Sequence, residues 1–409
     1  MIRRVAYLAM HTSPLLQPGV GNAGGMNVYV NELACTMAAR DVEAYVFTRR
    51  TDPDQPDMVK VRDGYRVVHI DAGPPRPLSI EELVPHVAEF GEGVVAATGD
   101  GTFDIVHSHY WLSGWAGVLV KEAHGLPLAN SFHTLGRVKD AARRDDESPS
   151  SSARLRAEEG VIALSDCVLA STPYEFDDLI DRYRASPERL CVSEPGIDHT
   201  LFTPGDRDEA RRKIGVGDEP IMLFVGRIQA HKGLDVAIET LPHLPDTVAI
   251  GDGPVRLMIV GGPSGSDGSR EIDRLRARAH AIGVGDRISF IAPQPHDELV
   301  DYYRAADLLV MPSRSESFGL VAAEAQASGL PVVASRVGGL PYVVGSSVSG
   351  LLINEHDPLS FAAAAAAILD HPGFRNHLSK GAIEYATRFS WAATADRLLD
   401  LYDGIAASI

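Results

Sequence analysis

The sequence predicts an α/β protein with two domains, each built on a doubly wound parallel sheet, and three observations support this. Short apolar or β-branched runs alternate with helical patterns, as in sheets whose strands are connected through helices. At 409 residues the chain is too long for one ordinary hydrophobic core. A polar, proline-bearing stretch at 204–220 separates two such series of runs. We therefore predict one domain over 1–205 and a second over 206–390.

The predicted strands divide evenly between the two domains. In the first domain they are the runs at 5–10, 42–47, 65–70, 105–109, 128–132 and 167–171. In the second domain they are the runs at 221–225, 257–260, 288–291, 308–311, 332–334 and 351–353. An alanine-rich run at 361–369 and a final amphipathic segment at 391–409 are predicted helices. Because ligands of doubly wound sheets collect at the carboxyl ends of the strands, we expect both domains to contribute to one cleft.

Composition argues against several classes of partner. A formal net charge of −17 and an isoelectric point near 5.3 would repel phosphate backbones, so we expect neither nucleic acid nor anionic membranes as partners. No stretch reaches the ~20 apolar residues of a membrane span, and the apolar run at the N-terminus is too short for a signal peptide. Cys35, Cys167 and Cys191 have no metal-ligand spacing and fit a reducing compartment. We expect a cytoplasmic protein.

Two carboxylates flank a glycine just after a predicted strand of the second domain. In the run 315–324, Ser-Glu-Ser-Phe-Gly-Leu-Val-Ala-Ala-Glu, seven residues separate Glu316 from Glu324. Glu316 falls in the loop after the strand, and Glu324 falls on the second turn of the following helix. Either glutamate alone is explained more simply as a helix cap or as a complement to the helix dipole. Together, beside a helix N-terminus that can bind phosphate, they indicate a site for a sugar nucleotide.

A glycine-rich loop follows the first predicted strand. The run 19–24 matches the dinucleotide motif G-x-G-x-x-G, but it begins nine residues after that strand, and the next strand is not followed by an acidic residue for a ribose. A nicotinamide-dependent oxidoreductase is therefore a remote alternative. The better interpretation is a flexible loop ending in Gly24 and Gly25, whose backbone amides, at the start of a helix over 27–40, approach a sugar phosphate. An ordinary loop with a helix cap is the simpler alternative.

Basic residues follow the first strand of the second domain. Arg227 comes directly after Gly226, and Lys232 follows five residues later. Either residue alone would pass for a surface charge. A guanidinium can bind phosphate through two hydrogen bonds, and an ammonium supplies a point charge. The two together can therefore stabilise the charge that grows on a departing nucleoside diphosphate.

Histidines follow two strands of the first domain. His107 and His109 end one predicted strand, and His133 follows the next. We expect no metal site here, because no carboxylate or cysteine completes a ligand set nearby. We also expect His107 and His109 to point to opposite faces of the sheet. His133 is the histidine that we expect to act in the cleft.

These motifs together resemble the family 4 retaining glycosyltransferases of the GT-B fold over nearly the whole chain. The resemblance rests on the two glutamates, the Gly226-Arg227 and Lys232 cations, the Gly24-Gly25 loop and the run Pro195-Gly196-Ile197-Asp198. It implies two Rossmann-like domains that face each other across a cleft, with the helix at 391–409 crossing back to the N-terminal domain. Within the family, the runs at 11–14, 24–29, 107–114 and 337–341 are most similar to actinobacterial enzymes that begin mycothiol synthesis. Sucrose-phosphate synthases are more distant relatives.

The resemblance implies a role for each motif. The diphosphate of the donor binds the two cations, the ribose hydroxyls bind Glu324, and the oxygen of the departing diphosphate takes the proton of the acceptor. Neither a metal nor another cofactor is then required, since protein cations supply the positive charge. The expected catalytic residues are His133, Arg227, Lys232 and Glu316. The expected donor-binding residues are Gly24, Gly25, Arg227, Lys232, Glu316, Phe318, Gly319, Leu320 and Glu324.

The acceptor site implied by the resemblance is less complete than the donor site. The expected acceptor-binding residues are His11, Asn27, Ile80, Tyr110, Thr134 and Arg154. Ile80 takes the place of a lysine that binds phosphate in the mycothiol enzymes, and the lost contact is worth roughly 1.5 to 3 kcal/mol. Asn22 also stands where those enzymes have an aspartate, and Phe132 stands where they have a small residue.

Two reactions are consistent with these residues. The resemblance implies transfer of N-acetylglucosamine from UDP-N-acetylglucosamine to myo-inositol 1-phosphate with retention of configuration. Ile80 and Phe132 motivate the alternative, a glycosyltransferase of antibiotic biosynthesis with a GDP-sugar donor and an unphosphorylated acceptor. The thiol ergothioneine, used in lincosamide biosynthesis, is an example of such an acceptor. Dimers in the family also favour a homodimer.

Overall fold

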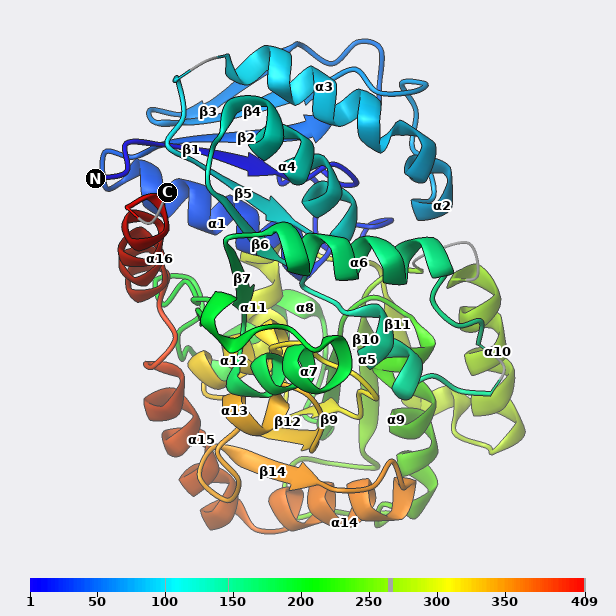
Figure 1. Ribbon diagram of the computed structural model, residues 1–409. Coiled ribbons are helices and arrows are strands. Elements are labelled where there is room, and N and C mark those ends of the chain that lie inside the picture. The colour runs from blue at the N-terminus through cyan, green and yellow to red at the C-terminus, as the bar shows by residue number, and fades with distance from the viewer. Residues whose placement is uncertain (100, 146, 264–267, 408–409) are drawn as a thin grey trace.

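The computed structural model describes residues 1–99, 101–145, 147–263 and 268–407. Within these ranges the strands form two sheets, one of eight and one of six strands, and helices cover both sheets (Figure 1). The predicted α/β class with two doubly wound sheets is confirmed. The predicted strands agree with the observed ones to within two residues at each end.

The first sheet has the order β3-β4-β2-β1-β5-β6-β7-β8. Its strands are β1 (Arg4–Leu8), β2 (Glu43–Arg49), β3 (Met58–Arg62), β4 (Tyr65–Ile70), β5 (Ile105–His109), β6 (Leu128–Ser131), β7 (Cys167–Ala170) and β8 (Leu190–Val192). Among the described residues, neighbouring strands pair in parallel except β3 with β4, which are antiparallel. The sequence analysis misses β3 and β8. β3 is a mostly exposed edge strand without a buried apolar face, and β8 is only three residues long.

Helices pack on both faces of this sheet. They are α1 (Gly25–Ala38), α2 (Ile80–Leu83), α3 (Val87–Thr98), α4 (Trp111–His124), α5 (Gly136–Ala141), α6 (Ser152–Leu164) and α7 (Pro173–Tyr183). Local sequence explains where several of them begin. The side chain of Thr172, for example, accepts a hydrogen bond from the backbone of Glu175, and Pro173 occupies the first position of α7.

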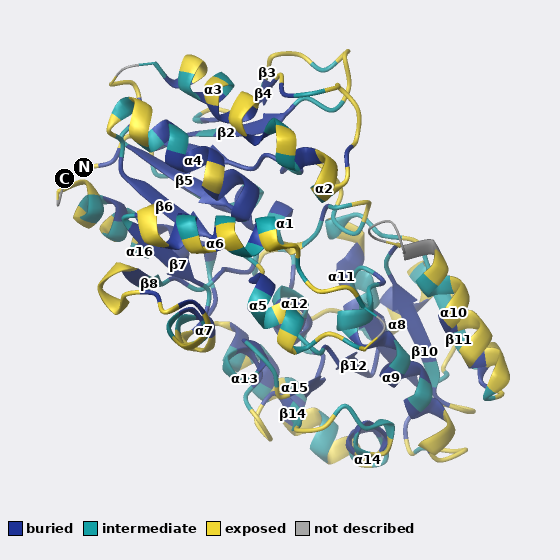
Figure 2. Cartoon of the chain, turned by 45° about the vertical axis from the view of Figure 1, so that its right-hand side comes forward, coloured by how far each residue is buried: buried dark blue, intermediate teal, exposed yellow. Residues whose placement is uncertain are grey.

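The second sheet has the order β11-β10-β9-β12-β13-β14, and its neighbouring strands pair in parallel within the described residues. Its strands are β9 (Ile221–Val225), β10 (Arg256–Val260), β11 (Ile288–Ile291), β12 (Leu308–Met311), β13 (Val332–Ser335) and β14 (Gly350–Ile353). The central strands are almost wholly buried, which explains their continuous apolar sequences (Figure 2). The helices are α8 (Arg207–Ile214), α9 (Leu234–Thr240), α10 (Gly268–Ala281), α11 (His296–Ala305), α12 (Leu320–Ala327), α13 (Leu340–Val343), α14 (Pro358–Leu369) and α15 (Pro372–Ala386).

The last helix, α16 (Trp391–Ala406), lies on the first domain, although the chain reaches it from the second. Figure 1 shows α16 beside α1, with the two ends of the chain close together. Trp391, Leu398 and Tyr402 are buried in the same apolar cluster as Tyr7 and Tyr29. The helix is therefore part of the core of the first domain.

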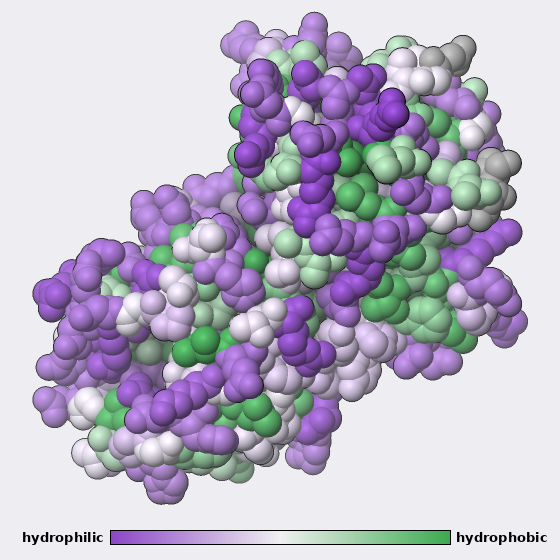
Figure 3. All heavy atoms as spheres, turned by 90° about the vertical axis from the view of Figure 1, so that its left-hand side faces the viewer, coloured by the Kyte–Doolittle hydropathy of each residue, from purple (hydrophilic) through white to green (hydrophobic). Residues whose placement is uncertain are grey.

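The face of the molecule in Figure 3 consists of two lobes, on which hydrophilic residues predominate and smaller apolar areas lie between them. In the ranges that the structure covers, no helix combines the length and the apolar character needed to cross a membrane.

Candidate active site between the domains

The carboxyl ends of the strands in both sheets open onto one large cavity of about 1880 Å³. Its walls include Gly24, Tyr110 and His133 of the first domain and Arg227 and Glu316 of the second. A site for one small molecule usually measures about 300 to 1000 Å³. The cavity between the domains therefore has room for two substrates.

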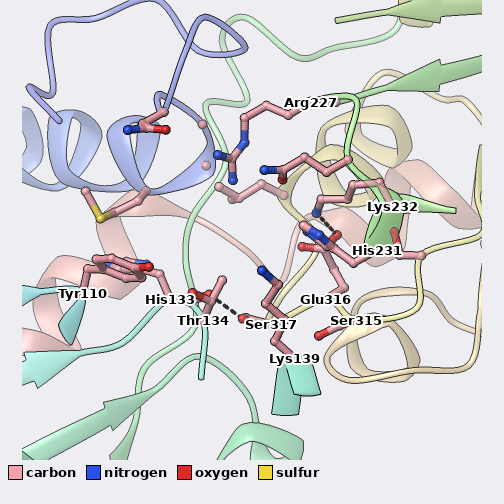
Figure 4. A pocket seen from close by; sticks show the side chains of 18 of the residues that line it. Tyr110, His133, Thr134, Lys139, Arg227, His231, Lys232, Ser315, Glu316 and Ser317 are labelled. Atoms are coloured by element: carbon pink, nitrogen blue, oxygen red, sulfur yellow. Dashed lines mark hydrogen bonds and ion pairs between the residues drawn. The ribbon is translucent and has the colours of Figure 1, made fainter. Parts of the chain in front are cut away.

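Arg227 and Lys232 both line the second-domain wall of the cavity (Figure 4). Lys232 Nζ forms an ion pair with Glu316 Oε2 at 2.6 Å. A Cβ atom at position 24 would lie 3.1 Å from Nε of Arg227, so a glycine there leaves room for the guanidinium. Burial lowers the pKa of Arg227, although Glu316 favours its charged form. An incoming diphosphate would meet two cations here, one of which is already oriented by a carboxylate.

The loop before α12 reaches across the cavity to the first domain. Ser317 Oγ donates a hydrogen bond to the carbonyl of His133, and the Ser317 carbonyl accepts one from Ser171 Oγ at 3.3 Å. Gly319 caps α12 with a φ of +106°, a conformation that favours glycine. Leu320, the first residue of α12, lies opposite Gly25, where a Cβ atom would be 3.4 Å from its Cδ1. The N-terminus of α12 therefore lies close to the start of α1. The side chain of Phe318 is buried, so only its backbone is available to a ligand.

Glu324 lines the same cavity, but it does not form a pair with Glu316. It is 4 % exposed, Oε1 lies 2.9 Å from Nε2 of His296, and Oε2 accepts a hydrogen bond from the Tyr303 hydroxyl at 2.9 Å. Burial opposes a charge on His296, but Glu324 outweighs it, and the pKa of His296 is raised. The sequence analysis misses His296, which begins α11 just after strand β11 at the edge of the cleft.

Tyr110, Thr134 and Arg154, which are predicted to bind the acceptor, lie together at the first-domain end of the cavity. Nη2 of Arg154 donates hydrogen bonds to the Thr134 carbonyl at 3.0 Å and to its Oγ1 at 3.3 Å. The guanidinium lies over the Tyr110 ring, 5.4 Å from its centroid. Behind it, Nε donates to the fully buried Glu158 at 2.8 Å. Arg154 is thus held in place on one side and faces the cavity on the other.

His11 lies against this group, with its ring centroid 4.5 Å from that of Tyr110. Burial, and then electrostatic interactions with Arg227, His133 and Arg154, lower the pKa of His11 to about 3. A neutral imidazole adds no positive charge to this end of the cavity, but it offers one N–H group and one lone pair.

Asn27 and Ile80 have different positions relative to the cavity. Asn27 is buried beneath the loop, donates to Thr12 Oγ1 at 2.8 Å and to the Ser13 carbonyl at 2.6 Å, and accepts from the Gly24 backbone at 2.9 Å. Both N–H groups of its amide are therefore used, so Asn27 shapes the glycine loop and is not placed to bind an acceptor. Ile80 begins α2 and lines the cavity, where it presents an apolar side chain.

The prediction that His107 and His109 point to opposite faces of the sheet is wrong. Residues two positions apart on a strand share a face, and the two ring centroids are 4.2 Å apart. His109 in turn contacts His133, whose ring lies at the cavity. In the described part of the chain, no cluster of three histidine, cysteine, aspartate or glutamate side chains is arranged to hold a metal ion.

Lys139 and His231 also line the cavity, and the sequence analysis misses both. Figure 4 shows the Lys139 side chain entering the cavity from α5, between Thr134 and Glu316. Burial, and then the charges of Lys232, Arg227 and Lys139, hold the pKa of His231 well below its ordinary value. Lys139 lies in the first turns of α5, which begins two residues after Thr134, and no local pattern in the sequence marks it as a cavity residue.

Comparison with known proteins identifies the family of this chain. The pattern "Glycosyl transferases group 1" matches residues 206–385, and the pattern "Glycosyl transferase 4-like domain" matches residues 24–196. A D-inositol 3-phosphate glycosyltransferase from Acidothermus cellulolyticus is 44% identical over 98% of this chain and 90% of its own length. The enzyme of that name from Saccharomonospora viridis is 45% identical over 98% of this chain and 94% of its own length.

Solved structures show the same fold. Sucrose-phosphate synthase from Thermosynechococcus elongatus superimposes with a TM-score of 0.92 and 31% identity, and 100% of both chains is covered. HepE from Anabaena, solved with UDP and glucose, gives a TM-score of 0.78 at 18% identity over 98% of this chain and 100% of its own, which is evidence for the fold alone. The chain therefore belongs to the group 1 glycosyltransferases of the GT-B fold, and it is a hexosyltransferase related over nearly its whole length to the D-inositol 3-phosphate glycosyltransferases.

Proposed function

We propose that this enzyme transfers N-acetylglucosamine from UDP-N-acetylglucosamine to an inositol monophosphate, D-inositol 3-phosphate by the names of its relatives. The observation that carries the proposal is the arrangement of Arg154, Thr134 and Tyr110 opposite Arg227 and Lys232 in one cavity. The two cations Arg227 and Lys232 suit the diphosphate of the donor, and Arg154, with the hydroxyl groups of Thr134 and Tyr110 beside it, suits the phosphate of the acceptor.

The reaction proceeds with retention of configuration in this proposal. The bond from the anomeric carbon to the diphosphate breaks, and the acceptor hydroxyl attacks that carbon from the same face. Its proton passes to the departing diphosphate oxygen. Arg227, Lys232 and the N-terminus of α12 stabilise the negative charge on the diphosphate, and no metal is needed for that step.

Glu324 binds the ribose of the donor in this proposal. Its carboxylate is held between His296 and Tyr303, so a ribose hydroxyl donates to a fixed acceptor. Lys139 adds positive charge between the two ends of the cavity. Its ammonium group supplies part of the positive charge for the acceptor phosphate that the apolar side chain of Ile80 cannot supply. By resemblance to the family, the enzyme works as a homodimer, which light scattering of the purified protein tests.

Ile80 favours a second candidate function. An apolar side chain on the cavity wall suits an acceptor without a phosphate, such as the thiol ergothioneine, with a GDP-sugar as donor. The two candidates differ in both substrates, so the nucleotide that the protein binds separates them.

Thermal unfolding in the presence of UDP, GDP, ADP and their sugar conjugates tests the proposal. A ligand at 100 times its dissociation constant adds about 2.7 kcal/mol to the stability. We expect UDP and UDP-N-acetylglucosamine to raise the melting temperature most. In a separate activity assay with UDP-N-acetylglucosamine, we expect UDP to be released only when inositol phosphate is present. Stabilisation by GDP instead would favour the second candidate, and no response to any nucleotide would contradict both.

A further inference from the structure

A direct hydrogen bond joins the rings of His109 and His133 at the edge of the cavity. Nδ1 of His109 lies 2.9 Å from Nε2 of His133. A hydrogen bond between two imidazole nitrogens contains one proton, so only one of the rings donates. The choice of donor decides whether His133 offers a substrate an N–H group or a lone pair.

Both rings are uncharged at neutral pH. Burial lowers the pKa of His133 to about 3. Burial, and then the neighbouring His107 and His133, hold the pKa of His109 well below its ordinary value. Each ring therefore carries one N–H group and one bare nitrogen.

The surroundings of Nε2 of His109 indicate which nitrogen of this ring carries the proton. Nε2 of His109 is buried and has no hydrogen-bond partner among the described residues. A proton on this nitrogen would leave a donor buried without an acceptor, and such orphaned N–H groups are rarer in proteins than unsatisfied acceptors. The proton of His109 therefore lies on Nδ1 and is donated to Nε2 of His133.

Neighbouring aromatic rings hold His109 in this orientation. The ring of Tyr7 is stacked on it, with centroids 5.9 Å apart and planes 26° apart. The ring of His107 lies 4.2 Å away, and that of Tyr29 lies 5.6 Å away. Turning the imidazole of His109 over would put a carbon atom where Nδ1 now lies, and the hydrogen bond to His133 would be lost.

We propose that His109 is a positioning residue that keeps His133 in the Nδ1–H tautomer, so that His133 acts on the substrate as a hydrogen-bond donor and not as a base. Nε2 of His133 already accepts from His109, and Nδ1 carries the proton, so the ring has no free lone pair. The backbone of His133 is held as well, with a φ of +59° and its carbonyl bonded to Ser317 of the other domain.

One consequence for the reaction follows. The acceptor proton cannot go to His133, so it goes to an oxygen of the departing diphosphate, while the N–H group of His133 is free to bind a sugar hydroxyl. This consequence rests on the proposed function, whereas the tautomer does not.

Nitrogen NMR of the intact protein with ¹⁵N-labelled histidine tests the tautomer without any substrate. Correlations between ring nitrogens and ring protons distinguish Nδ1–H from Nε2–H, and the spectrum of His133→Gln identifies the signal of His133. We expect Nδ1–H for His133 in the wild-type protein. An Nε2–H signal would overturn the proposal even if the enzyme proved to be the glycosyltransferase proposed above.

Two substitutions at position 109 test the positioning role. His109→Leu removes the hydrogen-bond donor to His133. His109→Asn keeps a donor, because the amide N–H group of asparagine lies near the position of Nδ1 in histidine. We expect His133 in His109→Leu to lose the pure Nδ1–H state and kcat to fall about tenfold, with a smaller change in KM for the sugar nucleotide. His109→Asn should retain both properties. An unchanged tautomer and an unchanged kcat in His109→Leu would contradict the proposal.

His69 provides the matched control. It is a buried histidine of the same sheet that contacts Pro56 instead of His133. His69→Asn should leave the tautomer of His133 as it is in the wild-type protein, and a change there would show that losing any buried histidine disturbs the signal.

Discussion

Lys232 and Glu316 hold each other in the wall of the cleft, where their side chains are 21 % and 16 % exposed. A pair in this position is less screened by water than an ion pair on the surface. The ammonium is also fixed in direction by the carboxylate, so in the proposed reaction little reorganisation is needed when charge develops on the departing diphosphate.

Replacing Lys232 by methionine removes the ammonium and leaves much of the side-chain volume. We expect kcat/KM for the sugar nucleotide to fall about 100-fold or more, since a preorganised donor to a developing charge has an effect of that size. Steady-state kinetics measure it. The control is Lys213→Met on the surface of the second domain, where Lys213 is 52 % exposed and pairs with Asp301. Equal losses in the two variants would contradict a role for Lys232 in the chemistry.

Ile80→Lys tests the identity of the acceptor. The new ammonium would face the cavity from the start of α2. If the acceptor carries a phosphate, its affinity should rise about tenfold, and calorimetric titration with inositol phosphate measures this. Ile80→Met serves as the control for a change of shape without a charge. No gain from lysine would favour the unphosphorylated acceptor.

Buried histidines predict how stability depends on pH. Burial, and then the proximity of His133, lower the pKa of His107 to about 3, whereas an unfolded histidine titrates near 6.5. Between those two pH values the unfolded chain binds a proton that the folded protein lacks. The free energy of unfolding therefore falls as the pH drops below 6.5, by about 1.4 kcal/mol per pH unit for each such histidine.

Urea unfolding between pH 6 and pH 4 measures this slope. We expect His107→Gln to reduce it by about 1.4 kcal/mol per pH unit, because one proton no longer binds only to the unfolded chain. His371→Gln, at an exposed position, should leave the slope unchanged. An unchanged slope in His107→Gln would mean that His107 is protonated in the folded protein.

Among the secondary-structure elements, the start of α12 depends on the neighbouring glycines at 338 and 339. The backbone N–H of Gly339 donates to the Glu316 carbonyl at 2.9 Å, and a Cβ atom on Gly339 would lie 2.2 Å from the Ser317 carbonyl oxygen. At Gly338, with a φ of +49°, a Cβ atom would lie 2.0 Å from the Glu316 carbonyl oxygen. The loop that carries Glu316 can therefore take this position only because Gly338 and Gly339 have no side chains, so their backbone packs directly against the backbone of Glu316 and Ser317.

Gly339→Ala should displace this loop. The added methyl group must push the Ser317 backbone away, and we expect UDP to bind at least about tenfold more weakly and the melting temperature to fall. Gly373→Ala in α15 is the control, since nothing lies within 4 Å of the added atom. Alanine in that helix should be neutral or slightly stabilising. Normal nucleotide affinity in Gly339→Ala would show that the loop position does not govern binding.

The elements themselves were largely predictable from the sequence. Buried parallel strands such as β9 and β12 have continuous apolar runs, so their bounds agree with the prediction. β3 was not predictable in this way, since its side chains are mostly exposed and its position depends on pairing with β4. α1 starts at Gly25, two residues before the predicted start. The side chain of Asn27 accepts a hydrogen bond from the backbone N–H of Gly24, the N-cap residue, and so stabilises the earlier start.

At the scale of the whole molecule, the first domain is completed by the last helix of the chain. Leu398 and Tyr402 of α16 are fully buried there, and the Tyr402 hydroxyl lies 2.5 Å from Nδ1 of His107. The two domains are consequently connected twice, once near residue 205 and once before Trp391. Any motion that opens the cleft has to move both connections together.

A fragment of residues 1–205 should therefore not fold cooperatively on its own. It lacks the side chains of α16 and would expose the apolar cluster around Tyr7 and Tyr29. Circular dichroism during heating measures this, with and without a peptide of residues 388–409. We expect the peptide to restore a cooperative transition, and the same peptide with Leu398→Ala and Tyr402→Ala to fail. Cooperative unfolding of the fragment alone would contradict the expectation.

The sequence by itself determined the α/β class, the positions of most strands, and the loops that line the cavity at Gly24, Arg227, Glu316 and His133. These features are local, because apolar runs set the strands and short motifs follow their carboxyl ends. Only the tertiary structure decided that Asn27 turns away from the cavity, that His109 contacts His133, and that Lys139 and His296 line the site. Those contacts depend on the order of strands in each sheet and on the approach of the two domains. They join residues far apart in the chain, so no local sequence pattern predicts them.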